Sequence, residues 1–274
     1  MKKLFLLIAA FAAISLAMTS CQKEETETPA FEEDLTTNED VATVTNLFQD
    51  TEDEADNQIE TRGGGLSCPT VTVTPDDGTF PRTATIDYGP DGCEGPNGRL
   101  RQGTIIVNQT APMASPGATR TITFDNFFVD GVQVQGLKTI TNAGTAGDNN
   151  IVFTRIVEGA SLTFPDGETV TWDASHTLTQ VAGADTPFLP DNVFEITGGS
   201  SGVNRNGVAF TAEITTPLIK RKNCPWIASG VRAITINGRT RTMDYGDGAC
   251  DRVATVTYPN GFTREVLIRN WWRL

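Results

Sequence analysis

The sequence contains one histidine, His176, and this scarcity limits the chemistry that the chain can perform. Histidine is the commonest general base and metal ligand in proteins, and a single imidazole with no identifiable nucleophile or acid partner does not define a catalytic site. In Val170–Leu178, apolar residues and His176 alternate with polar residues. This pattern is typical of a strand with one buried face, so we expect a hydrogen-bonded core histidine.

The sequence also lacks an apolar run long enough to cross a bilayer as a helix. Its longest run, Leu4–Met18, has about 15 residues, whereas a spanning helix needs about 20. The run follows two lysines and ends in Met18-Thr19-Ser20-Cys21, a lipidation motif in form. We expect residues 1–20 to be a lipoprotein signal peptide and Cys21 to carry acyl chains such as palmitate, which anchor the protein in a membrane. A secretory signal with a chance cysteine is the alternative.

The residues after Cys21 are Gln22-Lys23-Glu24-Glu25. With the lipidation motif, this segment resembles the export signal of uncharacterised surface lipoproteins of Bacteroidota, in which Gln-Lys and acidic residues follow the acylated cysteine. The resemblance covers roughly the first 60 residues in kind and brings no family active site with it. It implies anchoring in the outer membrane with display on the cell surface, and a domain that faces the periplasm is the alternative.

Negative charge is concentrated near the N-terminus. Residues 22–60 hold 14 acidic residues and one lysine, whereas residues 61–274 hold 20 acidic and 18 basic residues. A strongly acidic segment with few aromatic residues is typical of a solvated linker. We therefore expect residues 21–65 to be an acidic tether that ends in the glycine run 63–65, followed by a nearly neutral domain.

Part of this tether has helical spacing. The apolar residues Val41, Val44, Leu47 and Phe48 recur at intervals of three and four, and Asn38 precedes them as a candidate N-cap. The pattern predicts a short helix whose apolar stripe docks on the domain.

Basic residues form one cluster, Lys220-Arg221-Lys222, without interleaved aromatic residues. Nucleic-acid-binding surfaces combine a broad basic patch with such aromatics or with a recognisable motif. We therefore expect a solvated basic loop and no nucleic-acid partner.

The four cysteines other than Cys21 lie in two similar segments. Cys68-Pro69 precedes Thr85-Ile86-Asp87-Tyr88-Gly89 and Cys93, and Cys224-Pro225 precedes Thr242-Met243-Asp244-Tyr245-Gly246 and Cys250. This agreement indicates a duplicated unit. In an oxidising compartment it predicts the disulfides Cys68–Cys93 and Cys224–Cys250, each worth about 3–4 kcal/mol in the chain-entropy model. A zinc site is the alternative, but the short Cys-x-x-Cys spacing is absent.

Residues 66–274 alternate Thr, Val, Ile and Phe with polar residues and are divided by turn dipeptides such as Asp130-Gly131, Asn206-Gly207 and Asn237-Gly238. These patterns predict an all-β domain of twelve to fourteen strands. We expect an antiparallel meander of hairpins that forms a β-sandwich-like or partly open barrel domain, with the duplicated units either at its two ends or in two similar halves. In Val132–Leu137 the apolar side chains change from one face of the strand to the other at Gly136, which predicts a β-bulge there.

The duplicated units also hold the only metal-ligand candidates. Asp87 and Asp91 in the first unit, and Asp244 and Asp247 in the second, lie on glycine-rich turns where carboxylate oxygens could bind calcium. Their spacing matches no known calcium loop. We therefore favour the alternative in which Asp87 and Asp244 accept hydrogen bonds from turn amides, and we expect no cofactor.

Two tryptophans are candidates for stacking on a glycan, Trp226 beside a cysteine and Trp272 near the C-terminus. Core packing against the disulfide is the alternative for Trp226. We expect a non-enzymatic domain that binds a glycan or an envelope protein through exposed aromatics. A hydrolase that uses paired carboxylates, and a structural envelope protein, are the other two hypotheses.

Overall fold

The computed structural model describes residues 28–61, 68–95, 98–147, 150–186 and 189–268, with only the backbone described for residues 28–35. The signal peptide, Cys21, Gln22–Glu25, the glycine run 63–65 and Trp272 lie outside the described residues.

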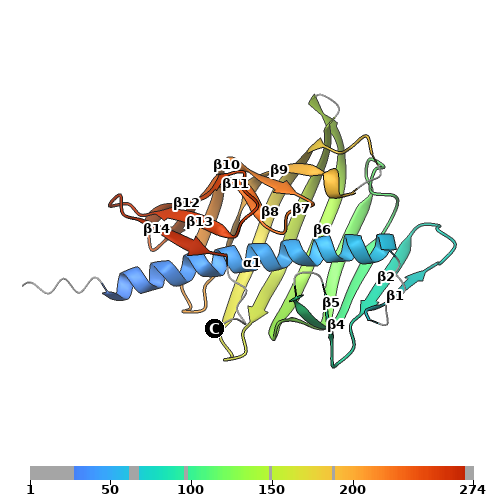
Figure 1. The fold of residues 1–274 in the computed structure, drawn as a ribbon, viewed down its shortest axis with the longest axis horizontal. Coiled ribbons are helices and arrows are strands. Elements are labelled where there is room, and N and C mark those ends of the chain that lie inside the picture. The colour runs from blue at the N-terminus through green and yellow to red at the C-terminus, as the bar shows by residue number, and fades with distance from the viewer. Residues whose placement is uncertain (1–27, 62–67, 96–97, 148–149, 187–188, 269–274) are drawn as a thin grey trace, which may run out of the picture.

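One antiparallel sheet of 14 strands forms the body of the molecule, which confirms the predicted all-β meander. Strands adjacent in the sequence pair along the sheet, except that β2 pairs with β4 and the short β3 pairs with β4 beside this path. The sheet runs from β1 to β14 without closing (Figure 1). The strands are β1 (Thr70–Thr74), β2 (Arg82–Asp87), β3 (Cys93–Glu94), β4 (Leu100–Gln109), β5 (Thr119–Val129), β6 (Val132–Ala146), β7 (Asn150–Thr163), β8 (Thr169–Ala182), β9 (Val193–Val203), β10 (Ala209–Arg221), β11 (Ile227–Ile236), β12 (Arg239–Asp247), β13 (Val253–Thr257) and β14 (Thr263–Leu267), with a short 3-10 helix, η4 (Leu189–Asp191), before β9.

Strand alternation gives the sheet one buried face, as the sequence predicts. In β8, Trp172, His176 and Leu178 are buried, while the polar residues that alternate with them are exposed. The predicted bulge also occurs, because the β6–β7 register shifts between Gln135 and Leu137. A side chain at Gly136 could not fit there, since a Cβ would lie 2.7 Å from the Cα of Ala160.

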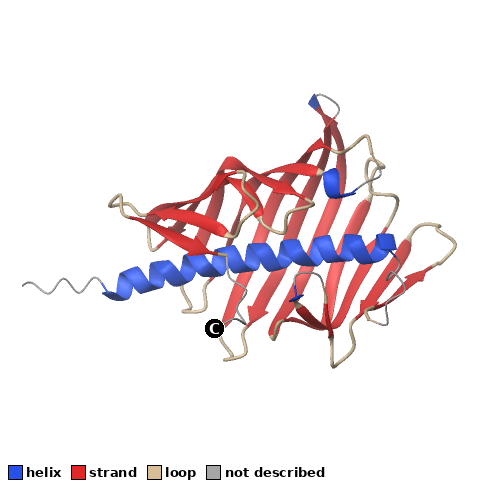
Figure 2. Cartoon of the chain, in the orientation of Figure 1, coloured by secondary structure: helices blue, strands red, loops and turns tan. Residues whose placement is uncertain are grey.

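A single long helix, α1 (Thr28–Thr61), lies across the buried face of this sheet (Figure 2). It contacts β1 and β2 near one edge, β8 in the middle, and β11 and β14 towards the other edge. None of the helices in the described part of the chain combines the length and apolarity that a membrane crossing requires.

The helix confirms one prediction for residues 21–65 and corrects three. Val41, Val44, Leu47 and Phe48 are at most 4% exposed, so the apolar stripe does dock on the domain. The helix is not short, however, and Asn38 lies within it rather than at its N-cap. Most residues from 37 to 56 are buried, so this acidic segment belongs to the domain core and is not a solvated tether.

Both predicted disulfides are present, Cys68–Cys93 and Cys224–Cys250. Each encloses one hairpin, β1–β2 or β11–β12, so the duplicated units lie near the two ends of the meander. Their Asp-Tyr-Gly segments also match, because Asp87 accepts a hydrogen bond from the Gly89 amide at 2.8 Å and Asp244 accepts one from the Gly246 amide at 2.9 Å. The turn-amide alternative is therefore correct for both carboxylates.

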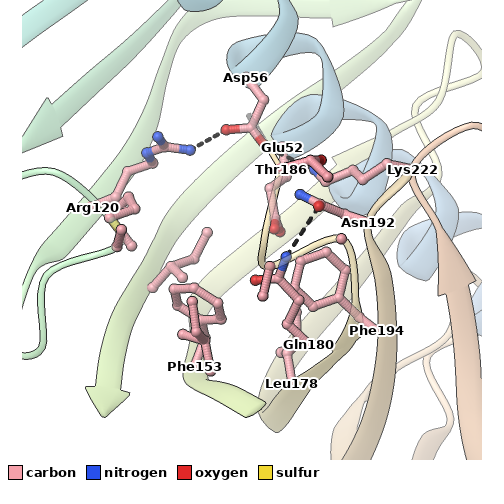
Figure 3. Close-up of a pocket in the computed structure, with 16 residues that line it drawn as sticks. Glu52, Asp56, Arg120, Phe153, Leu178, Gln180, Thr186, Asn192, Phe194 and Lys222 are labelled. Atoms are coloured by element: carbon pink, nitrogen blue, oxygen red, sulfur yellow. Dashed lines mark hydrogen bonds and ion pairs between the residues drawn. The ribbon is translucent and has the colours of Figure 1, made fainter. Parts of the chain in front are cut away.

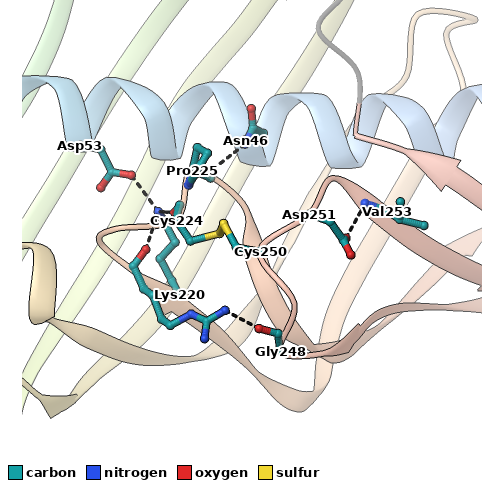
Figure 4. Close-up of a disulfide and its surroundings, with 10 residues drawn as sticks. Asn46, Asp53, Lys220, Cys224, Pro225, Gly248, Cys250, Asp251 and Val253 are labelled. Atoms are coloured by element: carbon teal, nitrogen blue, oxygen red, sulfur yellow. Dashed lines mark hydrogen bonds and ion pairs between the residues drawn. A yellow bond between two sulfur atoms is a disulfide. The ribbon is translucent and has the colours of Figure 1, made fainter. Parts of the chain in front are cut away.

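The second disulfide lies beside α1 (Figure 4). The amide of Asn46 donates a hydrogen bond of 3.1 Å to the carbonyl oxygen of Pro225, next to Cys224. On the first unit, the hydroxyl of Tyr88 donates to Glu54 at 2.8 Å. The duplicated units thus hold the helix at two separate places.

Candidate functional site: a cavity beside an ion-pair cluster

The acidic residues of α1 face basic residues of the sheet and its connections. Among the described residues, ten of the eleven ion pairs join α1 to the β-region. The basic partners are Arg99, Arg101, Arg120, Lys138, Arg155, Arg205, Lys220 and Lys222. The negative charge of the N-terminal segment therefore neutralises positive charge that the sheet carries on its buried face.

Eight of these side chains form one cluster where the C-terminal half of α1 faces the sheet. Glu52 lies 3.5 Å from Lys138 and 3.3 Å from Arg155. Asp53 lies 3.0 Å from Lys220 and 2.7 Å from Lys222, while Asp56 pairs with Lys222 at 2.7 Å and with Arg120. We call Glu52, Asp53, Asp56, Arg120, Lys138, Arg155, Lys220 and Lys222 the ion cluster.

The cluster fixes the protonation of its carboxyl groups. Burial alone would raise the pKa of Glu52, Asp53 and Asp56, but the neighbouring lysines and arginines outweigh burial and lower the pKa of all three. These residues are therefore carboxylates at neutral pH. A carboxylate with a lowered pKa is a poor general acid, because it holds no proton to donate.

The prediction of a solvated basic loop at Lys220-Arg221-Lys222 is wrong. Lys220 is 1% exposed, and Lys222 is held between Asp53 and Asp56. Strand alternation in β10 turns Lys220 towards α1, where carboxylates lie opposite it.

His176 is the buried core residue that the sequence predicts, 4% exposed. It packs against Trp172 and lies 3.4 Å from Arg155 through its Nδ1. Burial, reinforced by Arg155, Arg232 and Lys138, lowers the pKa of His176 to about 2. The imidazole is therefore neutral at physiological pH.

Replacing His176 by glutamine should remove one component of the acid sensitivity of the protein. The folded state resists protonation of His176 whereas the unfolded state takes up a proton near pH 6.5, so this residue makes stability fall as pH drops below about 6.5. The slope is at most about 1.4 kcal/mol per pH unit. Urea titrations of both proteins from pH 7.5 to 4.5 measure it. Asp130, whose raised pKa of about 6 acts in the opposite direction, is common to both and cancels in the difference. Parallel stability curves would contradict the assignment.

A cavity of about 240 Å³ opens beside the ion cluster, between α1 and the ends of β5 to β9 (Figure 3). Its apolar part is formed by side chains of four adjacent strands, Ile140 of β6, Ile151 and Phe153 of β7, Leu178 of β8 and Phe194 of β9. Its charged side consists of Glu52, Asp56, Arg120 and Lys222. Its lining also includes the buried Gln180, which donates a 3.0 Å hydrogen bond to Asn192. The cavity is therefore amphipathic.

The structure does not bring the calcium candidates together. Asp87, Asp91, Asp244 and Asp247 are all exposed and lie in the two separate units. Within the described residues, no group of three or more His, Cys, Asp or Glu side chains is placed to hold a metal ion.

Trp226 is partly buried and packs against the hydrophobic core. Among the large hydrophobic residues that the described surface exposes, Phe262 is the one aromatic. The described surface therefore lacks the exposed aromatic patch that we expected for glycan stacking.

The cavity residues were not predicted. The acidic residues of α1 were assigned to a tether, and Arg120, Lys138 and Arg155 have the appearance of ordinary polar positions in strands. One signal could have indicated them, since Glu52, Asp53 and Asp56 lie one, three and four positions apart and share a helix face. A helix that is apolar on one face and uniformly acidic on another needs a basic partner if it is buried.

No protein-family model, curated protein or solved structure matches the chain.

Proposed function

We propose that this chain is a lipid-anchored binding protein of the outer membrane, displayed on the cell surface, whose β-domain binds a small ligand without catalysis. The amphipathic cavity carries this proposal. Ligand sites combine an apolar surface with a few fixed polar groups, as do the aromatic floor and charged side of this cavity.

The state of the carboxyl groups favours binding over hydrolysis. A hydrolase of the kind considered above needs one carboxyl group that holds a proton beside another that does not. Both carboxyl groups at the cavity, Glu52 and Asp56, have lowered pKa values and are held by cations. They are suited to positioning other charged groups.

The anchor rests on the lipidation motif at Cys21. Helix α1 begins seven residues after this cysteine, and seven extended residues span at most about 25 Å. If Cys21 carries acyl chains, the domain is therefore held close to the membrane surface and does not hang from a long flexible stalk.

Dye binding tests the cavity. A neutral solvatochromic dye should bind to the protein, and an organic extract of the native membrane should displace it. Phe194→Asn should abolish the dye signal because it places an amide in the apolar floor. The matched control is Phe80→Asn, which changes a partly buried phenylalanine outside the cavity. Equal dye binding by Phe194→Asn and the wild type would contradict the proposed site.

Labelling tests the anchor separately. Wild-type protein should incorporate labelled palmitate and remain with the membrane fraction, whereas Cys21→Ala should do neither. Protease added to intact cells should digest the domain, and complete protection would favour the alternative in which it faces the periplasm.

A further inference from the structure

The ion cluster beside the cavity contains more cations than carboxylates. Its three carboxylates, Glu52, Asp53 and Asp56, face five cations, Arg120, Lys138, Arg155, Lys220 and Lys222. Burial lowers the pKa of Lys138 to about 8, so this lysine is still mainly protonated at neutral pH. His176 is neutral and adds no charge. Because uncompensated buried charge is costly, the cluster favours the arrival of a further negative group.

Arg120 offers that group a positive charge at the cavity. Its Nη1 pairs with Asp56, and its Nη2 donates to the side-chain oxygen of Gln109 at 3.1 Å. Its Nε is buried and donates to none of the described residues. Arg120 also lines the cavity, and its side chain is 12% exposed. Its positive charge can therefore face an oxyanion in the cavity.

The opposite side of the cavity is apolar and disfavours a purely polar occupant. Phe153 and Phe194 meet edge to face with their ring centroids 6.3 Å apart, and Leu178 lies beside them in the close-up view (Figure 3). This surface lies away from the Arg120–Asp56 pair, so a ligand that fills the cavity meets two cations and their paired carboxylates at one end and apolar side chains at the other.

We propose that the cavity binds an anionic amphiphile, with its carboxylate or phosphate beside Arg120 and Lys222 and its alkyl part against Phe153, Leu178 and Phe194. The proposal rests on the binding function above and specifies its ligand class. The volume of about 240 Å³ is below the roughly 300–1,000 Å³ of sites for drug-sized ligands, so a short alkyl chain or one end of a longer chain fits.

A headgroup series tests the proposal. Octanoate, octyl phosphate, octanol and octylammonium share one alkyl chain and are titrated calorimetrically into the protein that begins at residue 21 and carries Cys21→Ser. This protein has neither the apolar run Leu4–Met18 nor acyl chains, so it needs no detergent. At least one anion should bind ten-fold or more tightly than octanol, with octylammonium the weakest. The tighter anion distinguishes a carboxylate ligand from a phosphate ligand. If octanol binds as tightly as both anions, the proposed ligand class is wrong while the binding function stands. If no compound binds and the dye does not bind either, both are wrong.

Two substitutions locate the anion. Arg120→Gln should reduce the affinity for the anion to that for octanol, and the affinity for octanol should not change. Asp56→Asn should raise the affinity for the anion several-fold, because it removes the carboxylate that pairs with Arg120 and one of the two that pair with Lys222. A purely structural role for Asp56 would instead lower the affinity for every compound.

Arg82→Gln, on β2 and outside the cavity, is the control and should leave the affinity for every compound unchanged. If a variant fails to fold by circular dichroism, the headgroup ranking of the wild type decides.

Discussion

Replacing Glu52 by glutamine should lower the free energy of unfolding by about 3–5 kcal/mol. Glu52 is the one carboxylate within ion-pair distance of both Lys138 and Arg155 among the described residues, and both cations are nearly inaccessible to solvent. The substitution would leave two buried positive charges without their partner, and loss of one member of a buried ion pair is far more costly than loss of a surface pair. Equilibrium unfolding in urea measures the change.

The control for this substitution is Glu60→Gln, at an exposed position of the same helix. It removes the same charge and should change stability by no more than about 0.5 kcal/mol. The double variant Glu52→Gln with Lys138→Met should recover part of the loss, because it removes one of the stranded charges along with its partner. A loss below about 1 kcal/mol for Glu52→Gln alone would mean that water reaches the cluster and that the helix is not buried as described.

Replacing Phe48 by alanine should cost about 3–5 kcal/mol, the usual range for truncating a buried aromatic residue. Phe48 is 1% exposed and packs against Phe124 and Trp172, with ring centroids 6.0 and 5.3 Å away. The ammonium group of Lys138 lies 5.6 Å from the centroid of the Phe48 ring and donates to the Phe48 carbonyl oxygen. Truncation would therefore leave a cavity and weaken a cation–π contact where α1 meets the centre of the sheet.

Phe262→Ala provides the comparison, because this phenylalanine is 51% exposed. It should change the free energy of unfolding by less than about 1 kcal/mol. Near-ultraviolet circular dichroism should also report the loss of packing around Trp172 in Phe48→Ala. Similar effects of the two substitutions would show that α1 docks loosely on the sheet and contributes little to its stability.

The strands, the disulfides and the bulge could be predicted because their signals are local. Alternation in Val170–Leu178 and turn dipeptides such as Asn206-Gly207 depend on a few adjacent residues, and the duplicated Cys-Pro and Asp-Tyr-Gly segments select the pairing directly. The apolar stripe of Val41, Val44, Leu47 and Phe48 was equally local, and its docking was predicted correctly.

The cavity and the ion cluster could not be predicted because their parts are far apart in the sequence. Glu52 and Arg155 are separated by 103 residues, and Asp56 and Lys222 by 166. A charged residue in a strand normally faces water, so Lys138 and Arg155 have the pattern of surface positions until their carboxylate partners are known. An acidic segment without visible partners is likewise interpreted as a linker, which is why residues 37–56 were placed outside the domain.

The position of α1 at the start of the chain also sets the order in which the molecule can assemble. The helix is synthesised before any strand that it contacts, and its last partners come much later, with Pro225 lying 179 residues beyond Asn46. Contacts between such distant residues slow folding, since a long stretch of chain must be brought together before they form. Until β14 is synthesised the binding surface of the helix is incomplete, and the acidic residues of the helix keep it solvated in the meantime. The acidic residues that later neutralise the buried face of the sheet thus also keep the nascent chain from associating with other chains before the sheet is complete.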